Sequence, residues 1–390
     1  MSSARYRPLR ALCAFKHGGT PSKSNADYWR GDIPWVSPKD MKQAVIDSAT
    51  DFISTEAVAN SATSVVPPGS ILVVVRSGIL AHSFPIAQVA KQAAFNQDIK
   101  AIIPVSGEVG PDYLYWFLRS QSANVVMRGV KKGATVHSVQ SGFIENLMVP
   151  MKPHAEQRRI VDLLSRAEGI VRLRREAQQK VAELIPAIFI DMFGDPAMNP
   201  RGWPMSAIER MCPVLTGATP RKEERRYYEG GTVPWVRTGE VKGRQILEVE
   251  ERITELALAD TNCKVFPVDT ILVAMYGQGQ TRGRAGMLKT PAATNQACAA
   301  ILPSNEINAR FLFEALNLQY DRLRAMGRGG NQANLNLAMI KELQVPSPPM
   351  DMQLEFVERC IATGSILGQQ VAATEKSVAT FDALLSRAFD

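Results

Sequence analysis

The sequence predicts an α+β fold in which two mixed α/β globules are separated by an antiparallel pair of long helices that form a coiled coil. Three observations predict this fold. The chain contains an internal repeat with an offset close to 200 residues. Each repeat begins with short, apolar, strand-like runs and ends in a long stretch whose apolar residues recur at helical spacing. Positive charge is carried mainly by the two globular parts.

The internal repeat is visible as matches that keep their order along the chain. Gly18-Gly19-Thr20-Pro21 recurs as Gly217-Ala218-Thr219-Pro220, and Pro34-Trp35-Val36 recurs as Pro234-Trp235-Val236. Further matched pairs are Ile71-Leu72-Val73 with Ile271-Leu272-Val273, Asn96-Gln97 with Asn295-Gln296, Pro153 with Pro349, Gln157 with Gln353, and Phe193 with Phe389. Because chance does not preserve so many matches in order, we expect a duplication with pseudo-two-fold symmetry.

The globular part of each repeat contains short buried strands. Residues 71–75 and 270–275 are apolar, rich in β-branched side chains and bounded by turn residues, which predicts buried strands. Residues 99–103 and 297–302 have the same character. Shorter helices are expected within residues 112–127 and 307–326.

The second part of each repeat is predicted to be one long helix that starts at a proline. The apolar positions recur about every 3.5 residues, as in a coiled-coil seam. In the first helix they are Ile160, Leu163/Leu164, Ala167, Ile170/Val171, Ala177, Val181, Leu184 and Ile188, and in the second Leu354, Val357, Ile361, Gly364, Leu367, Val371, Thr374, Val378, Phe381 and Leu385. Pro186 is expected to kink or shorten the first helix.

These elements predict four parts in the chain. Residues 1–152 form the first globule, 153–194 the first long helix, 195–348 the second globule and 349–390 the second long helix. The two helices are expected to lie antiparallel and to carry one globule at each end. Two-fold proteins contact DNA half-sites about 34 Å apart or a multiple of that distance. Since the two globules are related but not identical, we expect them to read different short sequences in an asymmetric, bipartite target.

Charge favours a nucleic acid as the partner. The chain has a net charge of +7 and a pI of about 9.2. Residues 1–150 carry 15 basic and 10 acidic groups, and residues 196–346 carry 19 and 15, so the excess of positive charge lies in two separate blocks, which suits a polyanion. No apolar run reaches the length of a membrane span, which predicts no membrane association. The five cysteines are scattered, which favours a reducing, cytoplasmic location over a disulfide framework or a zinc site.

The sequence predicts no catalytic, cofactor-binding or metal site. It lacks the Asn/Asp-Pro-Pro-aromatic run of adenine methyltransferases and the GxxxxGK[S/T] phosphate loop. The glycines at positions 277, 279 and 283 have the wrong spacing for a dinucleotide loop. Together these absences favour a binding protein over an enzyme.

Candidate DNA-binding residues are forked donors and acceptors, because Arg pairs with guanine and Gln or Asn with adenine. In the second repeat a glycine-rich loop carries Tyr276, Gln278, Gln280, Arg282 and Arg284, and a second cluster contains Arg322, Arg324, Arg328, Asn331 and Gln332. The first-repeat counterparts are Arg76 and Ser77 for the loop, and Arg128, Lys131, Lys132 and His137 for the second cluster. The second clusters are expected to contact phosphates. Trp35 and Trp235 are expected to pack inside the protein.

The repeated motifs resemble a known family. Gly-x-Thr-Pro, a following Tyr, Gly-x-x-Pro-Trp-Val and the later Asn-Gln are similar to the target-recognition domains of type I restriction–modification specificity subunits, as is the loop at residues 275–283. The helices that start at Pro153 and Pro349 resemble the spacer regions of that family.

The resemblance implies a non-catalytic subunit that reads double-stranded DNA. It also implies two modification subunits, docked on the spacer helices, that bind S-adenosylmethionine and methylate adenine. Restriction subunits that use ATP and Mg²⁺ would join them, and the chain itself would carry no cofactor. Two alternatives remain open: a coiled-coil adaptor that does not bind DNA, and a DNA-modifying enzyme with an unfamiliar active site.

Overall fold

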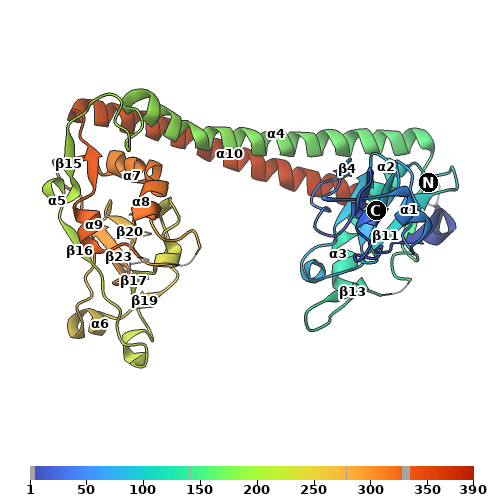
Figure 1. The fold of residues 1–390 in the computed structure, drawn as a ribbon, viewed down its shortest axis with the longest axis horizontal. Helices are drawn as coiled ribbons and strands as arrows, with labels where there is room; N and C mark the ends of the chain where they lie inside the picture. Colours follow the sequence, from blue (N-terminus) through green and yellow to red (C-terminus); the bar gives the residue numbers. More distant parts are fainter. Residues whose placement is uncertain (1–4, 141, 278, 327–333) are drawn as a thin grey trace. The chain divides into compact units, whose positions relative to one another are not determined.

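The chain folds into two compact units, each of which contains one globule and about half of each long helix. The structure, a computed structural model, describes residues 5–140, 142–277, 279–326 and 334–390. Residues 1–175 and 372–390 form the first unit, and residues 176–371 form the second. The division cuts both long helices, α4 (His154–Phe193) and α10 (Met350–Phe389), which are labelled in Figure 1.

The globule of the first unit is built from four small sheets. Their strand orders are β1 (Arg5–Pro8)-β14 (Met148–Met151); β5 (Asp51–Ile53)-β3 (Ile33–Val36)-β10 (Ala93–Phe95)-β6 (Val65–Val66); β2 (Cys13–His17)-β11 (Ile99–Pro104)-β7 (Ile71–Val74)-β9 (Ile86–Val89)-β4 (Val45–Ile46); and β12 (Val130–Lys131)-β13 (His137–Val139)-β8 (Arg76–Ser77). Its helices are α1 (Thr55–Ala59), α2 (Pro111–Ser120) and α3 (Ser122–Asn124), and α3 continues into a π-helical turn at Val125–Gly129.

The globule of the second unit repeats this plan. Its sheets are β15 (Met205–Ala207)-β24 (Gln344–Pro346); β16 (Val214–Thr216)-β23 (Cys298–Ile301)-β20 (Ile271–Ala274)-β21 (Ala285–Leu288)-β18 (Gln245–Ile246); and β19 (Arg252–Ile253)-β17 (Val233–Val236)-β22 (Ala293–Thr294). Its helices are α5 (Ile208–Met211), α6 (Glu255–Asp260), α7 (Ala309–Leu318), α8 (Tyr320–Met326) and α9 (Leu337–Lys341). The five-stranded sheets of the two units match strand for strand, which confirms the predicted duplication.

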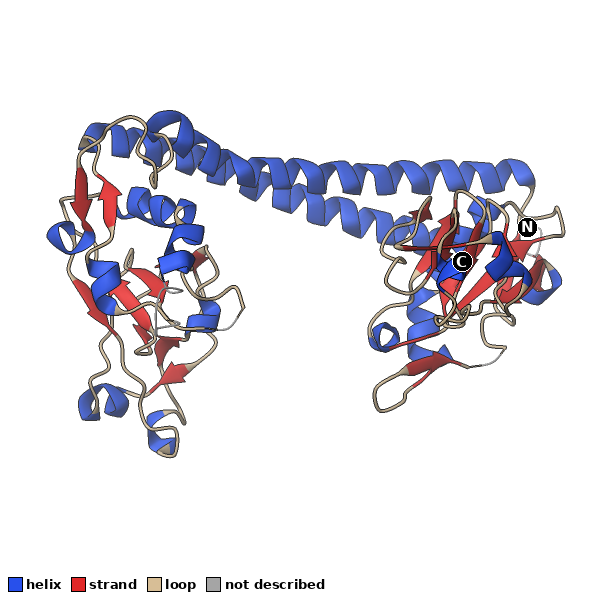
Figure 2. Ribbon diagram, in the orientation of Figure 1, coloured by secondary structure: helices blue, strands red, loops and turns tan. Residues whose placement is uncertain are grey.

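The central strands form where the sequence is most continuously apolar. All four residues of β7 and all four of β20 are buried, and each strand has antiparallel neighbours on both sides. A strand buried on both faces needs apolar side chains at every position, which is why the run predicts it. The observed strands differ from the predicted ranges by at most one residue at either end. Figure 2 shows the strands and helices of both globules.

The repeated Gly-x-Thr-Pro and Asn-Gln motifs contact each other inside each globule and stabilise it. The Cα of Gly18 lies so close to β10 that a Cβ would sit 2.1 Å from the carbonyl oxygen of Asn96. The Thr20 hydroxyl donates a hydrogen bond of 2.6 Å to Gln97, and Thr219 makes the same bond to Gln296 in the second unit. Each motif therefore fixes a turn against the end of a strand.

The two tryptophans of the Pro-Trp-Val motifs are buried, as predicted. Trp35 is 6% exposed and Trp235 is 2% exposed. Each indole nitrogen donates to a backbone carbonyl in the Gly-x-Thr-Pro turn, at Gly19 and Ala218 respectively. Because a buried indole N–H needs such an acceptor, these rings are part of the fold.

The two long helices pack together antiparallel. In the first unit, Leu164 and Val171 of α4 belong to the same buried core as Phe381 and Phe389 near the end of α10. In the second unit, Phe189 near the end of α4 contacts Phe356 near the start of α10, with ring centroids 5.4 Å apart. Since the start of each helix pairs with the end of the other, the predicted antiparallel arrangement is confirmed.

The seam of α10 is displaced by one residue from the predicted positions in its first turns. Leu354 and Ile361 are 50% and 68% exposed. The buried residues are Gln353, Phe356, Cys360 and Thr363. Gln353 is drawn inward because its side chain accepts a hydrogen bond of 2.8 Å from the N–H of Asn308 and donates another of 2.8 Å to the carbonyl of Pro348. Gln157 makes equivalent bonds to Gly110, Glu108 and Lys152 in the first unit.

The proline in the first long helix does not shorten it. The helix continues beyond Pro186 to Phe193, and Gly194 follows with φ +79°, a conformation that glycine adopts without strain. Proline has no N–H to donate to the carbonyl of Ala182, one turn earlier. Pro186 itself is exposed.

The cysteines, all of which lie in the described parts of the chain, are free and buried. Burial raises the pKa of Cys13 and of Cys298 to about 12, which keeps both thiols protonated and unreactive. Within the described ranges, no helix has both the length and the apolar character that crossing a membrane requires.

Candidate nucleic-acid interface

In both globules the end of the central strand meets the segment that returns from the short helices. The N–H of Val139 donates to the carbonyl of Val75 at 2.8 Å in the first unit. The N–H of Leu335 donates to the carbonyl of Met275 at 3.2 Å in the second. Val75 and Met275 directly precede the two predicted loops, so in each globule the predicted loop begins beside a segment that follows the short helices.

In the first globule this place is the sheet β12-β13-β8. Antiparallel pairing sets His137 opposite Ser77 and Ser138 opposite both Arg76 and Lys131. Four of the six predicted residues of this repeat therefore lie on neighbouring strands, although they are up to about 60 positions apart in the sequence.

The charged side chains of this sheet extend into solvent. Arg76 is 63% exposed, and its Nε lies 3.6 Å from Asp98. Lys131, at the end of β12, and Lys132, in the turn that follows it, are both exposed. The N–H of Gly133 donates to Nδ1 of His137 at 3.1 Å, which closes the turn. The result is a short positive ribbon on the surface.

Arg128 lies beside this sheet, on the π-helical turn. The amide of Gln140 donates to the Arg128 carbonyl at 3.4 Å. Arg128 shares a recess of about 560 Å³ with the amide side chains of Gln121, Asn124 and Asn146. Amides can both donate and accept, which is the chemistry that adenine recognition uses.

In the second globule the loop after β20 is closed by backbone bonds. The N–H of Gly283 donates to the carbonyl of Ala274, and the N–H of Ala274 donates to the carbonyl of Arg284, at 2.8 and 2.9 Å. Gly279 and Gly283 have φ of +61° and +84°, values that side chains disfavour. The glycines therefore permit a tight loop that presents Tyr276, 41% exposed, and the exposed Gln280.

Tyr320, the first residue of α8, organises the basic side chains of this loop. The guanidinium carbon of Arg284 lies 4.1 Å from the centre of the Tyr320 ring, and that of Arg324 lies 5.6 Å from it. The Tyr320 hydroxyl donates to the carbonyl of Gln280 at 2.7 Å. Arg324 donates to the Tyr320 oxygen at 3.2 Å and to the carbonyl of Gly279 at 2.9 Å. We call Arg284, Tyr320 and Arg324 the Tyr320 cluster.

The Tyr320 cluster holds the loop with two arginines that were predicted as DNA contacts, Arg284 for a base and Arg324 for a phosphate. Cation–π contacts and hydrogen bonds hold the two guanidinium groups in place without neutralising their charge. Tyr320 itself was not predicted, although a Tyr four positions before an Arg on a helix is a detectable signal. Arg322 donates to Gln319 at 2.8 Å, outside the cluster. The predicted residues Gln278, Arg328, Asn331 and Gln332 lie outside the described residues.

Comparison with known families assigns the chain. Residues 2–183 and 200–360 match the family profile described as the type I restriction modification DNA specificity domain, one match per repeat. The chain belongs to this family. Relatives that match the chain are specificity subunits of type I restriction–modification systems.

Individual specificity subunits are similar over parts or most of the chain. The EcoR124I/EcoR124II specificity subunit of Escherichia coli is 37% identical over 180 residues, which cover 46% of this chain and 44% of that subunit. The chain thus spans less than half the length of that relative. The MjaIX specificity subunit of Methanocaldococcus jannaschii is 25% identical over 365 residues, which cover 87% of this chain and 82% of that subunit.

Solved structures share the fold of this chain. The type I S subunit from M. genitalium covers the whole chain with a TM-score of 0.54 and 15% identity, and the chain covers 97% of it. A second solved structure, from work on complex assembly and conformational transition of the type I R-M system, matches the whole chain with a TM-score of 0.68 and 16% identity. The match covers 98% of that structure's chain. These likenesses support two mixed α/β globules with two long, packed helices.

Proposed function

We propose that this chain is the non-catalytic specificity subunit of a type I restriction–modification system and that each of its globules reads one half of a bipartite DNA target. The observation that carries the proposal is that, in each globule, the loop after the central strand lies beside basic residues from a later segment: Lys131 in the first and Arg324 of α8 in the second. When two separate segments of the chain place positive side chains on one part of the surface, that surface can bind the phosphate backbone of DNA and reach the bases beside it.

The two reading surfaces differ, which supports an asymmetric target. The first globule presents the three-stranded ribbon with Arg76, Lys131 and His137. The second presents a glycine-rich loop held by the Tyr320 cluster. Surfaces of different shape and different donor pattern select different base sequences.

Within the second surface the residues divide into two roles. Arg284 and Arg324 keep their positive charge while bonded to the loop, so they provide a fixed field for phosphates. Tyr276 and Gln280 stand exposed on the loop, and the Gln280 amide can pair with an adenine edge. Arg282 contributes to the same loop. In the first surface, Arg128, Lys131, Lys132 and His137 provide the phosphate contacts, and Arg76 and Ser77 are the candidates for base contacts.

The long helices carry the partner subunits in this proposal. Two modification subunits, which bind S-adenosylmethionine and methylate adenine, dock on α4 and α10, and restriction subunits that use ATP and Mg²⁺ join them in the prokaryotic cytoplasm. The outer face of α4 in the first unit supports this role. Leu163, Ile170 and Leu173 are 45%, 50% and 57% exposed there. Apolar residues aligned on one exposed helix face are typical of a protein interface.

Methylation by the reconstituted system tests the function. The purified chain with S-adenosylmethionine is expected to methylate no DNA, and addition of its modification subunits is expected to produce adenine methylation at one bipartite sequence. The readout is transfer of labelled methyl groups, followed by sequencing of the modified positions. Methylation by the chain alone would favour the enzyme alternative, and an assembled complex without DNA affinity would favour the adaptor.

The Tyr320 cluster gives a test of the site. Arg324→Ala removes the hydrogen bonds to Tyr320 and Gly279, so the loop loses its brace and one charge. We expect the assembled methyltransferase to bind its target about 10- to 100-fold more weakly, and the salt dependence to become shallower. Titration of a labelled duplex at several salt concentrations measures both. Arg210→Ala on α5 removes an exposed charge from the same unit and is the control; equal losses in both variants would contradict the role of the loop.

A further inference from the structure

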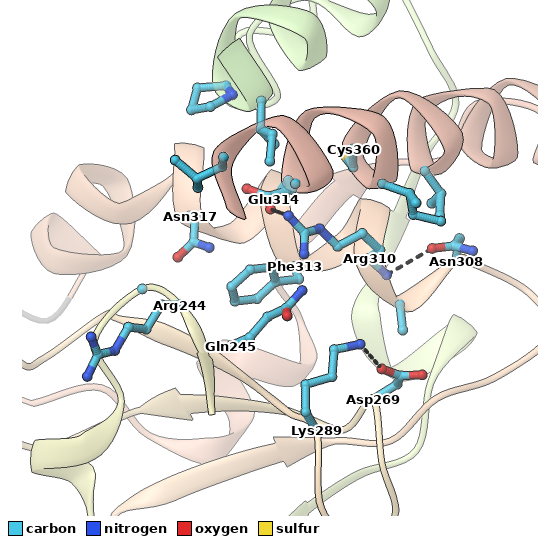
Figure 3. A pocket seen from close by; sticks show the side chains of 18 of the residues that line it. Arg244, Gln245, Asp269, Lys289, Asn308, Arg310, Phe313, Glu314, Asn317 and Cys360 are labelled. Carbon is cyan, nitrogen blue, oxygen red and sulfur yellow. Dashed lines mark hydrogen bonds and ion pairs between the residues drawn. The ribbon is translucent and has the colours of Figure 1, made fainter. Parts of the chain in front are cut away.

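The second unit contains a recess between α7 of its globule and the long helices. Its volume is about 810 Å³, and all residues that line it belong to the second unit. Its apolar walls come from three helices: Ile185 and Pro186 of α4, Phe313 of α7, and Ile361 and Leu367 of α10. Sites for small organic molecules have volumes of roughly 300–1,000 Å³ and are lined mainly by apolar side chains with a few polar groups. Figure 3 shows the recess.

The corresponding space in the first unit is filled. There the ring of Trp116, which is 3% exposed, lies 5.8 Å from the ring of Phe381. The guanidinium of Arg119 lies 4.8 Å from the Trp116 ring and forms an ion pair with Glu168 of α4. An indole, a phenyl ring and an ion pair thus close the junction between α2 and the long helices.

The internal repeat identifies the equivalent residues. The N–H before α2, at Gly110, and the N–H before α7, at Asn308, both donate to the repeated glutamine side chains. This superimposes α2 on α7 with an offset of 198 and the long helices with an offset of 196. Trp116, Arg119, Glu168 and Phe381 then correspond to Glu314, Asn317, Gly364 and Ile185. All four of these residues line the recess.

The recess therefore exists because the second repeat lacks the side chains that plug the first. A Trp and an Arg are replaced by shorter polar residues, a Glu by Gly, and a Phe by Ile. The recess is open to solvent, since Pro186, Ile361 and Gly364 on its walls are exposed. The missing plug also defines what would fit, since an indole occupies the equivalent place in the first unit.

Polar groups also line the recess. Ala182 and Pro186 both line it, and Pro186 has no N–H to donate to the Ala182 carbonyl one turn earlier. The position equivalent to Pro186 in the first unit is Asp382, which has an N–H. The Arg310–Glu314 pair at 2.7 Å and the Lys289–Asp269 pair at 2.7 Å lie on opposite sides, with Phe313 and Gln245 between them (Figure 3).

We propose that this recess binds a flat aromatic small molecule with a ring N–H, such as an indole-type heterocycle. The ring takes the place that Trp116 fills in the first unit, between α7 and the long helices, and its N–H donates to the Ala182 carbonyl. The bound ligand braces the second globule against its helices, as Trp116 and Phe381 brace the first. This inference does not depend on how either globule reads DNA.

Indole is the probe for the test. By isothermal titration and saturation-transfer NMR, the full chain is expected to bind one indole per molecule, and indole is expected to raise the melting temperature. Glu314→Trp installs the side chain of the first repeat and is expected to weaken indole binding at least tenfold. Ile185→Phe fills the recess from the opposite wall and is expected to do the same, so the result does not rest on one variant.

Trp116→Ala is the matched variant in the first unit. It removes the natural plug and is expected to raise the stoichiometry from one indole to two. Absence of indole binding to the unmodified chain, or undiminished binding in both Glu314→Trp and Ile185→Phe, would overturn the proposal. If modification subunits displaced indole and bound less tightly to Glu314→Trp, the occupant would be an aromatic side chain of that partner, and the small-molecule assignment would be wrong.

Discussion

Exchange of residues 1–152 for the first globule of another family member is expected to change one half of the methylated sequence and to leave the other half unchanged. The physical reason is that each reading surface is assembled within its own unit. The pairing of β8 with β13 sets Arg76 opposite Ser138 in the first, and the Tyr320 cluster forms in the second. Since a mismatched base pair typically costs about 1–3 kcal/mol, a new half-site of several base pairs replaces the old one completely.

Methylome sequencing of a host that carries the exchanged gene with its modification subunits measures the outcome. The reciprocal exchange of residues 195–348 is the matched control and is expected to change only the other half-site. If either exchange altered both halves, the two globules would not read independently.

The exchange works only if the donor globule keeps its contacts with the helices. Tyr113 and Phe117 of α2 lie 5.2 and 5.8 Å, ring to ring, from Phe389 of α10, and Trp116 contacts Phe381. These rings belong to the core of the first unit, although they come from opposite ends of the chain. A donor without aromatic residues at these positions would leave cavities, and large-to-small changes of buried aromatics cost about 3–5 kcal/mol. Donors with matching aromatics are therefore the ones to choose.

The sequence predicts the architecture well because the duplication and the apolar spacing are properties of many residues at once. Helices α4 and α10 begin directly after Pro153 and Pro349, and α4 ends directly before Gly194, as expected from capping and helix-breaking chemistry. The central strands follow from continuous apolar runs. Each of these features is local in the sequence, so no knowledge of distant contacts is needed.

Features that depend on distant partners are not predictable in this way. The seam at the start of α10 includes Gln353 because an N–H from another part of the chain, at Asn308, needs an acceptor. The pairing of β8 with β13 joins segments about 60 residues apart, and the role of Tyr320 appears only when α8 meets the loop. The recess cannot be predicted from the sequence of the second repeat alone. It requires a comparison of the residues that line it with the equivalent residues of the first repeat, which fill the junction there.

Gly217→Ala is expected to unfold the second globule or to destabilise it by about 3 kcal/mol or more. A Cβ at this position would lie 1.9 Å from the carbonyl oxygen of Thr294, which is backbone and cannot rotate away. The approach is fixed, because the neighbouring N–H of Ala218 donates to that same oxygen at 3.0 Å. Separation of the two segments would break this bond and the adjoining turn that Thr219 ties to Gln296.

Denaturant titration followed by circular dichroism measures the loss. Gly239→Ala is the control, since a Cβ there meets no atom within 4 Å, and it is expected to leave stability nearly unchanged. Gly18→Ala should produce the same loss in the first unit, because its Cβ would lie 2.1 Å from Asn96. Similar stabilities for Gly217→Ala and Gly239→Ala would show that the backbone of the turn can move to accommodate the added Cβ. In that case the repeated motif would have to be explained by contact with DNA, because close packing would no longer require glycine at this position.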